Sequence, residues 1–128
     1  SYFTIQDTIF YKNNVEFLKS KKDSTLLDEV AAFLKNNSFR EFIIFGNANK
    51  NEYLHIDKYK YKKLLKKYNK YSPVKISKSV NLPLYRALVV FDYLFKAGVP
   101  PQKMFCIGQK HAPDEELNFA KTYFHLKH

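Results

Sequence analysis

The segment that most constrains the fold runs from Asn81 to Gly108 and reads NLPLYRALVVFDYLFKAGVPPQKMFCIG. Pro83 suits the first turn of a helix, where its missing N–H costs no hydrogen bond, and Asn81 is a good capping residue. Gly98 and the two prolines that follow it predict that the helix ends near Ala97. Between these limits apolar residues recur at helical spacing and form one face: Leu84, Ala87, Leu88, Phe91, Leu94 and Phe95.

Short apolar runs predict four strands. Tyr2 to Tyr11 mixes aromatic and β-branched residues. Glu41 to Phe45 is a continuous apolar run, and we expect Gly46 to end it. Met104 to Ile107, closed by Gly108, predicts a buried strand, and Lys121 to Leu126 predicts the last one.

A second helix is predicted from Ser24 to Asn36. Its apolar residues recur at helical spacing, Ser24 or Thr25 is available as its cap, and two asparagines follow it. The order of elements is therefore strand, helix, strand, a long segment, helix, strand and strand. A chain of 128 residues is long enough to bury one core, so we expect a single domain.

Cys106 is the one cysteine, and it lies inside an apolar run, so it predicts a small buried hydrophobe rather than a reactive thiol. No apolar run approaches the roughly 20 residues that cross a bilayer. The chain begins with Ser1 rather than methionine, which suggests a fragment or a mature form, and any export signal or lipid anchor would lie outside this sequence.

The segment from Leu82 to Gly108 also resembles a known family. The pattern L-x-x-x-R-A, an apolar helix ending Y-L-x-x-x-G-V, then a short strand and a glycine is similar to the second half of the OmpA-like domain. That domain is the peptidoglycan-binding module of outer-membrane protein A, peptidoglycan-associated lipoprotein and flagellar motor stators. The matching residues are Leu82, Arg86, Ala87, Tyr93, Leu94, Gly98, Val99, Gly108 and Pro113.

The resemblance implies a two-layer α/β sandwich with the order β-α-β-(insertion)-α-β-β and helices on one side of a mixed sheet. One OmpA-like domain would span residues 1–128, with a Lys/Tyr-rich insertion at about 50–78. Within the insertion, Ile56, Tyr61, Leu64, Leu65 and Tyr68 can share one side of a helix that ends at Ser72-Pro73. Val74 to Ile76 is expected to be a short extended piece.

The family pocket binds the diaminopimelate of a peptidoglycan stem peptide, whose side-chain terminus presents a carboxylate and an ammonium. A guanidinium answers the carboxylate with two parallel hydrogen bonds, and an aspartate answers the ammonium. The resemblance assigns Arg86 to the carboxylate and Leu82 to the pocket wall. Asn49, in the run Gly46-Asn47-Ala48-Asn49, stands at the position of the aspartate.

Each of these residues also has a purely structural interpretation. Arg86 could stabilise the fold by pairing with a carboxylate or with loop carbonyls, and Asn49 could be a turn residue that uses its own side chain. Asn49 brings no charge to an ammonium, so wall binding would be weakened unless Glu52 or Asp57, just downstream, compensates.

The chain carries a net charge of +10, from 20 lysines and two arginines against 12 acidic residues. Many of the lysines fall in the insertion. Such a run is most often a solvated face over packed tyrosines, and the next interpretation is a docking surface for a protein partner. Contact with anionic lipid head groups or with nucleic acid are further alternatives, the last resting on charge alone.

The sequence indicates no chemistry beyond binding. The four histidines do not predict a metal site, because His125 and His128, three residues apart, would fall on opposite faces of a strand, and His55 and His111 have no partners in sequence. Nucleophile, nucleotide-binding and paired-carboxylate motifs are missing. We therefore expect no enzyme activity, no cofactor and no metal.

The resemblance implies that the domain attaches an envelope protein or complex to peptidoglycan in the periplasm. One arrangement that it implies is anchoring to the outer membrane, as in a lipoprotein. The alternative is a structural subunit of an envelope assembly such as a secretion system, docking through the insertion with wall binding weak or lost.

Overall fold

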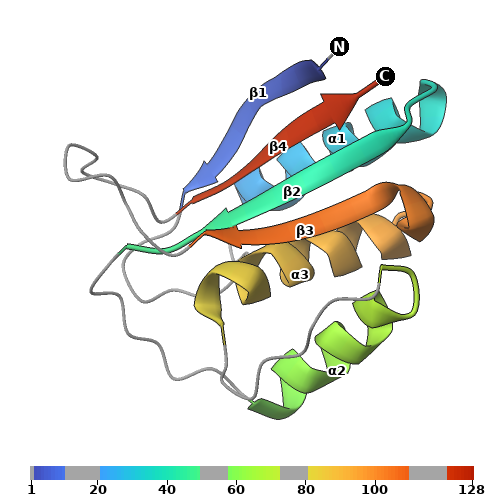
Figure 1. Ribbon diagram of the computed structural model, residues 1–128. Helices are drawn as coiled ribbons and strands as arrows, with labels where there is room; N and C mark the ends of the chain where they lie inside the picture. The colour runs from blue at the N-terminus through green and yellow to red at the C-terminus, as the bar shows by residue number, and fades with distance from the viewer. Residues whose placement is uncertain (1, 11–20, 50–57, 73–80, 110–120) are drawn as a thin grey trace.

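The computed structural model describes residues 2–10, 21–49, 58–72, 81–109 and 121–128 (Figure 1). Eight elements follow one another in these residues: β1 (Tyr2–Phe10), α1 (Lys21–Asn36), β2 (Glu41–Asn47), α2 (Lys58–Asn69), α3 (Leu82–Lys96), the short 3-10 helix η1 (Pro101–Lys103), β3 (Met104–Gln109) and β4 (Lys121–Lys127).

The four strands form one mixed sheet in the order β1-β4-β2-β3. β4 runs antiparallel to both β1 and β2, whereas β2 and β3 are parallel and pair from Phe42↔Met104 to Asn47↔Gln109. Because β2 and β3 are parallel, their carboxyl ends lie at the same edge of the sheet. The segments that follow β2 and β3 therefore begin next to each other, at Asn47 and Gln109.

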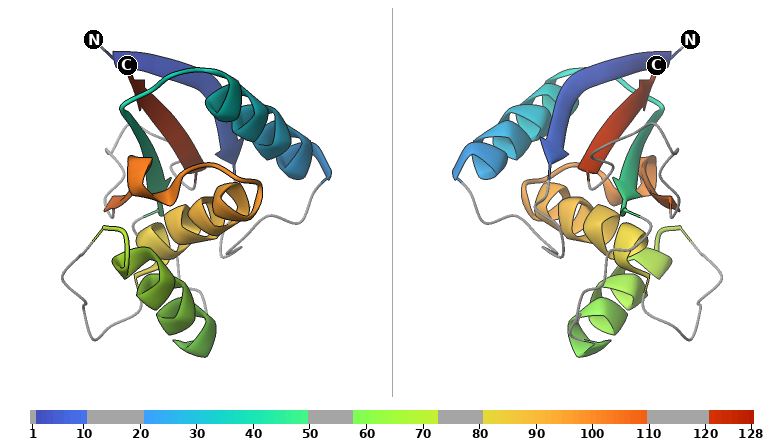
Figure 2. Two further views of the ribbon diagram at one scale, coloured as in Figure 1. Left: turned by 90° about the vertical axis from the view of Figure 1, so that its right-hand side faces the viewer. Right: turned by 90° about the vertical axis from the view of Figure 1, so that its left-hand side faces the viewer.

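α1 and α3 lie side by side on one face of this sheet (Figures 1 and 2). Inward residues of the strands alternate with outward ones, and Phe42 of β2 stacks on Phe124 of β4 with ring centroids 5.3 Å apart. The Tyr93 hydroxyl of α3 donates to Asp28 of α1 at 2.6 Å. α3 is the central helix of the core, with eight buried residues: Pro83, Tyr85, Arg86, Ala87, Leu88, Val90, Phe91 and Leu94.

α2 comes from the insertion and packs against α3 beside the edge strand β3 (Figure 2). Its buried face consists of Tyr61, Leu65 and Tyr68. The Tyr68 ring meets Phe91 of α3 edge-on at 5.0 Å, and its hydroxyl accepts a 2.9 Å hydrogen bond from the backbone N–H of Cys106 in β3. An open strand edge presents unpaired backbone groups, which can pair with other chains. The Tyr68 hydroxyl of α2 satisfies one such group of β3, the Cys106 N–H, which β2 cannot reach.

Two glycines let α3 approach the sheet closely at its first turn. A Cβ on Gly46 of β2 would overlap the carbonyl oxygen of Pro83 and lie 2.8 Å from the amide nitrogen of Ala87. A Cβ on Gly108 of β3 would lie 2.7 Å from the amide nitrogen of Leu84. Side chains at these positions would push the helix away, so both glycines are required by contact with α3.

Most boundaries expected from sequence are confirmed. Asn81 caps α3 by accepting from the Leu84 N–H at 3.0 Å, and Ala97 is its C-cap. Cys106 is buried, and burial raises the pKa of its thiol well above the ordinary value, so the thiol stays protonated. The expected architecture, with two helices on one side of a mixed sheet and an insertion before the second, is also present.

Four expected boundaries were wrong. β3 does not close at Gly108 but continues to Gln109, and its Ile107 is exposed although the strand was expected to be buried. α2 ends at Asn69 rather than at Ser72-Pro73.

α1 begins at Lys21 rather than at Ser24, whose hydroxyl instead donates to the Lys21 carbonyl at 3.0 Å inside the first turn. β2 continues past Gly46 to Asn47 because its parallel pairing with β3 extends through Gly46↔Gly108.

Some expectations fall on residues that the structure does not describe. They concern the outer parts of the insertion, with Ile56 and the extended piece from Val74 to Ile76, and the family proline, Pro113. Among the described residues, no helix is long and apolar enough to cross a membrane.

Replacing Gly46 by alanine should destabilise the domain more than the same change at Gly98. Overpacking typically costs about 1–3 kcal/mol and occasionally more, and the new Cβ at Gly46 should cost at least the upper value because it meets backbone atoms that cannot rotate away. Gly98 has a φ of +100°, but its nearest neighbour is the flexible Lys35 side chain, so Gly98→Ala should cost only about 1–2 kcal/mol. Urea unfolding of both variants measures the difference, and equal losses would contradict the close approach of α3.

The hydroxyl of Tyr68 should contribute more to the free energy of unfolding than the hydroxyl of Tyr71. Tyr68→Phe leaves the buried Cys106 N–H without its acceptor, which costs about 1–3 kcal/mol. Tyr71 is partly buried and its hydroxyl makes no hydrogen bond within the described residues, so Tyr71→Phe should change stability by less than about 0.5 kcal/mol. Urea unfolding together with hydrogen exchange at the Cys106 amide would test this, and unchanged exchange in Tyr68→Phe would count against the contact.

Candidate functional site

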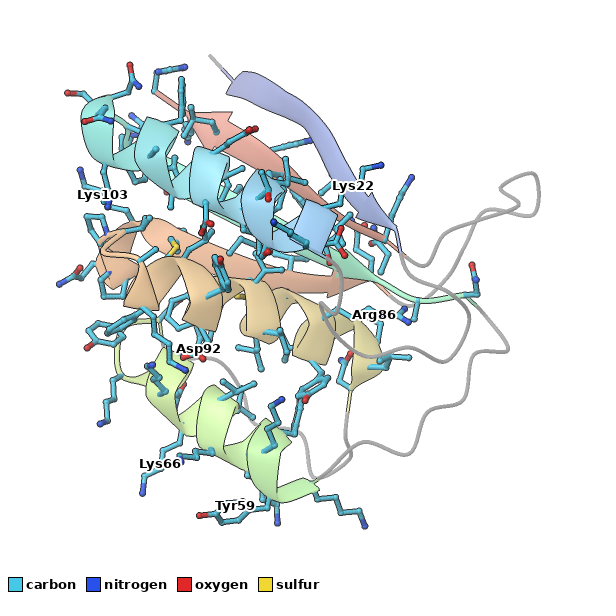
Figure 3. All side chains as sticks on the ribbon, turned by 180° about the vertical axis from the view of Figure 1, so that it is seen from behind. Lys22, Tyr59, Lys66, Arg86, Asp92 and Lys103 are labelled. Atoms are coloured by element: carbon cyan, nitrogen blue, oxygen red, sulfur yellow. The ribbon has the colours of Figure 1, made fainter. Side chains whose placement is uncertain are left out.

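Arg86 lies in the first turns of α3, near the carboxyl end of β2 (Figure 3). Its side chain is 0% exposed, and its Nη1 donates a 2.8 Å hydrogen bond to the backbone carbonyl of Asn47. The close approach of α3 at Gly46 brings the guanidinium within reach of that carbonyl, one residue further along the chain. The helix and the end of β2 together position this side chain.

The contact agrees with the structural interpretation of Arg86, in which it binds a loop carbonyl. A buried guanidinium needs hydrogen-bond acceptors, because a charge taken out of water is otherwise costly. The carbonyl of Asn47 supplies one of them. In this structure no part of the Arg86 side chain is open to a ligand, so a ligand carboxylate reaches it only after the covering residues move.

Asn47 was missed by the sequence analysis. It is 0% exposed, and neither polar atom of its side-chain amide has a hydrogen-bond partner among the described residues. A buried amide without partners typically costs about 1–3 kcal/mol per unmade bond. The available indication in the sequence was an asparagine directly after Gly46, two positions before Asn49, the residue expected in the pocket.

The other two predicted site residues flank this contact. Leu82 is the first residue of α3 and is partly buried against the core. Asn49 is partly exposed and lies two residues beyond the carbonyl that Arg86 binds. Arg86 and the Gly46–Asn49 segment are thus brought together, as the family pattern implies. Glu52 and Asp57, the two possible substitutes for the missing carboxylate, lie outside the described residues.

A second candidate surface lies between α2 and α3, and we call it the lysine groove. It is a depression of about 670 Å³. Asp92 of α3 accepts hydrogen bonds from Lys67 of α2 at 2.6 Å and from Lys96 of α3 at 2.9 Å. Lys67 also lies 4.5 Å from the centre of the Phe95 ring. The residues that line the groove are Lys60, Lys63, Leu64, Lys66, Lys67, Lys70, Asp92 and Lys96.

Burial alone would raise the pKa of the Asp92 carboxyl, but hydrogen bonds and charge from Lys67 and Lys96 outweigh burial and hold this pKa below its ordinary value of 3.8. The ionised form is therefore favoured by the folded state. Among the described residues that line the groove, Asp92 is the one acidic side chain, and it joins α2 to α3 through Lys67.

No metal site is found in the described parts of the chain, where no group of three or more His, Cys, Asp or Glu side chains comes together. His125 instead lies on the face of the sheet away from the helices, 4.9 Å from the ring centre of Phe45.

No protein-family model and no curated protein sequence matches the chain. Solved structures do. The peptidoglycan-associated lipoprotein from Burkholderia pseudomallei superimposes with a TM-score of 0.58 at 16% identity, covering 94% of this chain and 89% of that one. The OmpA-like domain of FopA1 from Francisella tularensis gives 0.60 at 14% identity, covering 98% and 80%. The C-terminal domain of Helicobacter pylori MotB gives 0.54 at 15% identity, covering 92% and 83%.

These similarities confirm the fold expected from the segment around Arg86. The chain has the fold of OmpA-like domains. The identities are too low for the comparisons to carry over the role of any single residue.

The ion pair between Asp92 and Lys67 should make part of the stability depend on pH. Because the folded state lowers the pKa of Asp92, its contribution is present above the ordinary value of 3.8 and is lost as the pH falls below it. Asp92→Asn should therefore lower the free energy of unfolding by about 1 kcal/mol or less at neutral pH, and the difference from wild type should vanish in acid. Urea unfolding across this range measures it. In a Lys67→Met background, Asp92→Asn should lower the free energy of unfolding by less. A difference between wild type and Asp92→Asn that does not depend on pH would contradict the ion pair as its cause.

Proposed function

We propose that this domain binds peptidoglycan without catalysis and attaches an envelope protein or complex to the cell wall. The OmpA-like fold supports this proposal, since one of the similar structures is a peptidoglycan-associated lipoprotein and the other two are an OmpA-like domain and the C-terminal domain of MotB. We further propose that the ligand is the diaminopimelate of the stem peptide and that the domain is located in the periplasm.

The observation on which the proposal chiefly rests is the contact between Arg86 and the Gly46–Asn49 segment. The two parts of the chain expected to form the pocket come from α3 and from the end of β2, far apart in sequence, and they meet here. In our proposal Arg86 binds the ligand carboxylate, Leu82 lines the pocket and Asn49 accepts from the ligand ammonium. The unpartnered amide of Asn47 adds a polar group whose hydrogen bonds a ligand could supply.

Asn49 should make this binding weak. Hydrogen bonds to charged groups contribute about 1.5–3 kcal/mol and neutral ones about 1 kcal/mol. Asn49 can accept one hydrogen bond from the ammonium but adds no charge of its own. The loss relative to an aspartate is therefore on the order of tenfold in affinity.

A second candidate function is a structural subunit of an envelope assembly in which wall binding has been lost. The complete burial of Arg86 favours it, because a guanidinium closed off from solvent and bonded to a backbone carbonyl already has a structural role. The neutral Asn49 favours it as well. In this case the fold would be retained for its shape and its surface.

Cosedimentation with isolated Gram-negative sacculi tests the first function against the second. Wild type should bind weakly, and free diaminopimelate should compete. Asn49→Asp should bind on the order of tenfold more tightly, because it restores the charge opposite the ammonium. Arg86→Lys should bind less, because an ammonium cannot make the two parallel hydrogen bonds.

Two controls keep this experiment interpretable. Gln102→Glu adds the same charge at an exposed position in η1, before β3 and so at the opposite end of the sheet from Asn49, and it should leave binding unchanged. Arg86→Lys must be shown folded by its urea transition, since Arg86 is buried. If wild type and Asn49→Asp both stay in solution, the wall-binding function is wrong and the structural subunit is favoured.

A further inference from the structure

We propose that α2, with the lysine groove beside it, binds the phosphate groups of an anionic lipid membrane surface. α2 reads KYKYKKLLKKYN, with six lysines and no acidic residue. Its buried face is taken by Tyr61, Leu65 and Tyr68, so the lysines are left on the remaining sides of the helix. This surface belongs to the insertion and is separate from the contact at Arg86.

The outer side of α2 presents positive charge along its length. Lys63, Lys66 and Lys70 are exposed, and none of them has an ion-pair partner among the residues that the structure describes. Their spacing of three and four residues places them on one side of the helix, over a length of about 10 Å. Figure 3 shows Lys66 extending away from α3, and Tyr59, which is 75% exposed, extends outward from the start of the same helix.

The groove adds further lysines to these three, which also line it: Lys60, Lys67 and Lys96. The described residues that line it, six lysines and one aspartate in all, carry a formal charge of +5. Asp92 binds Lys67 and Lys96 and so ties α2 to α3, while it offsets only one of these charges. The positive surface is therefore held on a packed pair of helices.

The kinds of side chain favour a lipid surface over a protein partner. Lysine is depleted in protein–protein interfaces, where arginine and buried aromatic residues are enriched. Among the described residues that line the groove there is neither an arginine nor an aromatic side chain. Lysine ammonium groups are point charges on flexible stems and can follow phosphates whose positions are not fixed.

Single-stranded nucleic acid is also disfavoured, because its binding surfaces carry several aromatic side chains on which successive bases stack, whereas α2 exposes one tyrosine, Tyr59. Tyr59 fits the lipid surface, since tyrosines are enriched at the level of the head groups.

Cosedimentation with phosphatidylglycerol-rich vesicles tests the proposal. Wild type should bind them, should not bind phosphatidylcholine vesicles, and should be released as the salt concentration rises. Each lysine near such a surface contributes roughly a fivefold factor in partitioning. The triple variant Lys63→Glu, Lys66→Glu and Lys70→Glu should therefore bind on the order of 100-fold less.

A matched triple separates this surface from net charge. Lys21→Glu, Lys22→Glu and Arg40→Glu alter exposed residues at the start of α1 and in the turn before β2. Each exchange removes two charges, so both triples lower the net charge from +10 to +4. The matched triple should keep most of the binding. Equal losses in both triples, or failure of the folded wild type to bind the vesicles, would overturn the proposal and leave an acidic protein or nucleic acid as the partner.

Discussion

The close approach of α3 to the ends of β2 and β3 is the constraint on which the rest of the structure depends. Gly46 and Gly108 face each other across the parallel pair, and α3 lies against both, so its first turn sits over the edge of the sheet where these strands end. This geometry brings the guanidinium of Arg86 to the carbonyl of Asn47. The candidate site is thus a consequence of how tightly one helix packs on two strands.

The insertion adds a helix with two separate faces. Its inner face supplies Tyr68, which packs on Phe91 and satisfies the Cys106 amide at the edge of the sheet. Its outer face carries lysines and little else. The apolar face gives the helix a fixed place on α3, since a lysine-rich helix of 12 residues would be marginal alone in water. A functional surface can therefore be added without disturbing the contact at Arg86.

The candidate site was only partly accessible from sequence. The L-x-x-x-R-A pattern singled out Arg86, and the structure places its side chain in contact with the Gly46–Asn49 segment, while the binding role of these residues stays a prediction. The sequence could not decide whether Arg86 faces a ligand or is buried against a backbone carbonyl. Every residue has a carbonyl, and the sequence does not indicate which one a side chain reaches. Asn47 was missed for the same reason, since the atom of Asn47 that binds Arg86 is its backbone carbonyl oxygen.

Apart from η1, the sequence by itself determined the type and order of the elements in the described residues and both limits of α3, because caps, glycines, prolines and apolar periodicity act over a few residues. Tertiary structure decided the true end of β2, the start of α1 and the state of Arg86. β2 extends through Gly46 because β3 pairs with it there, and Arg86 is closed off because α3 packs against both strands. These features depend on contacts between residues far apart in the chain, which local patterns cannot specify.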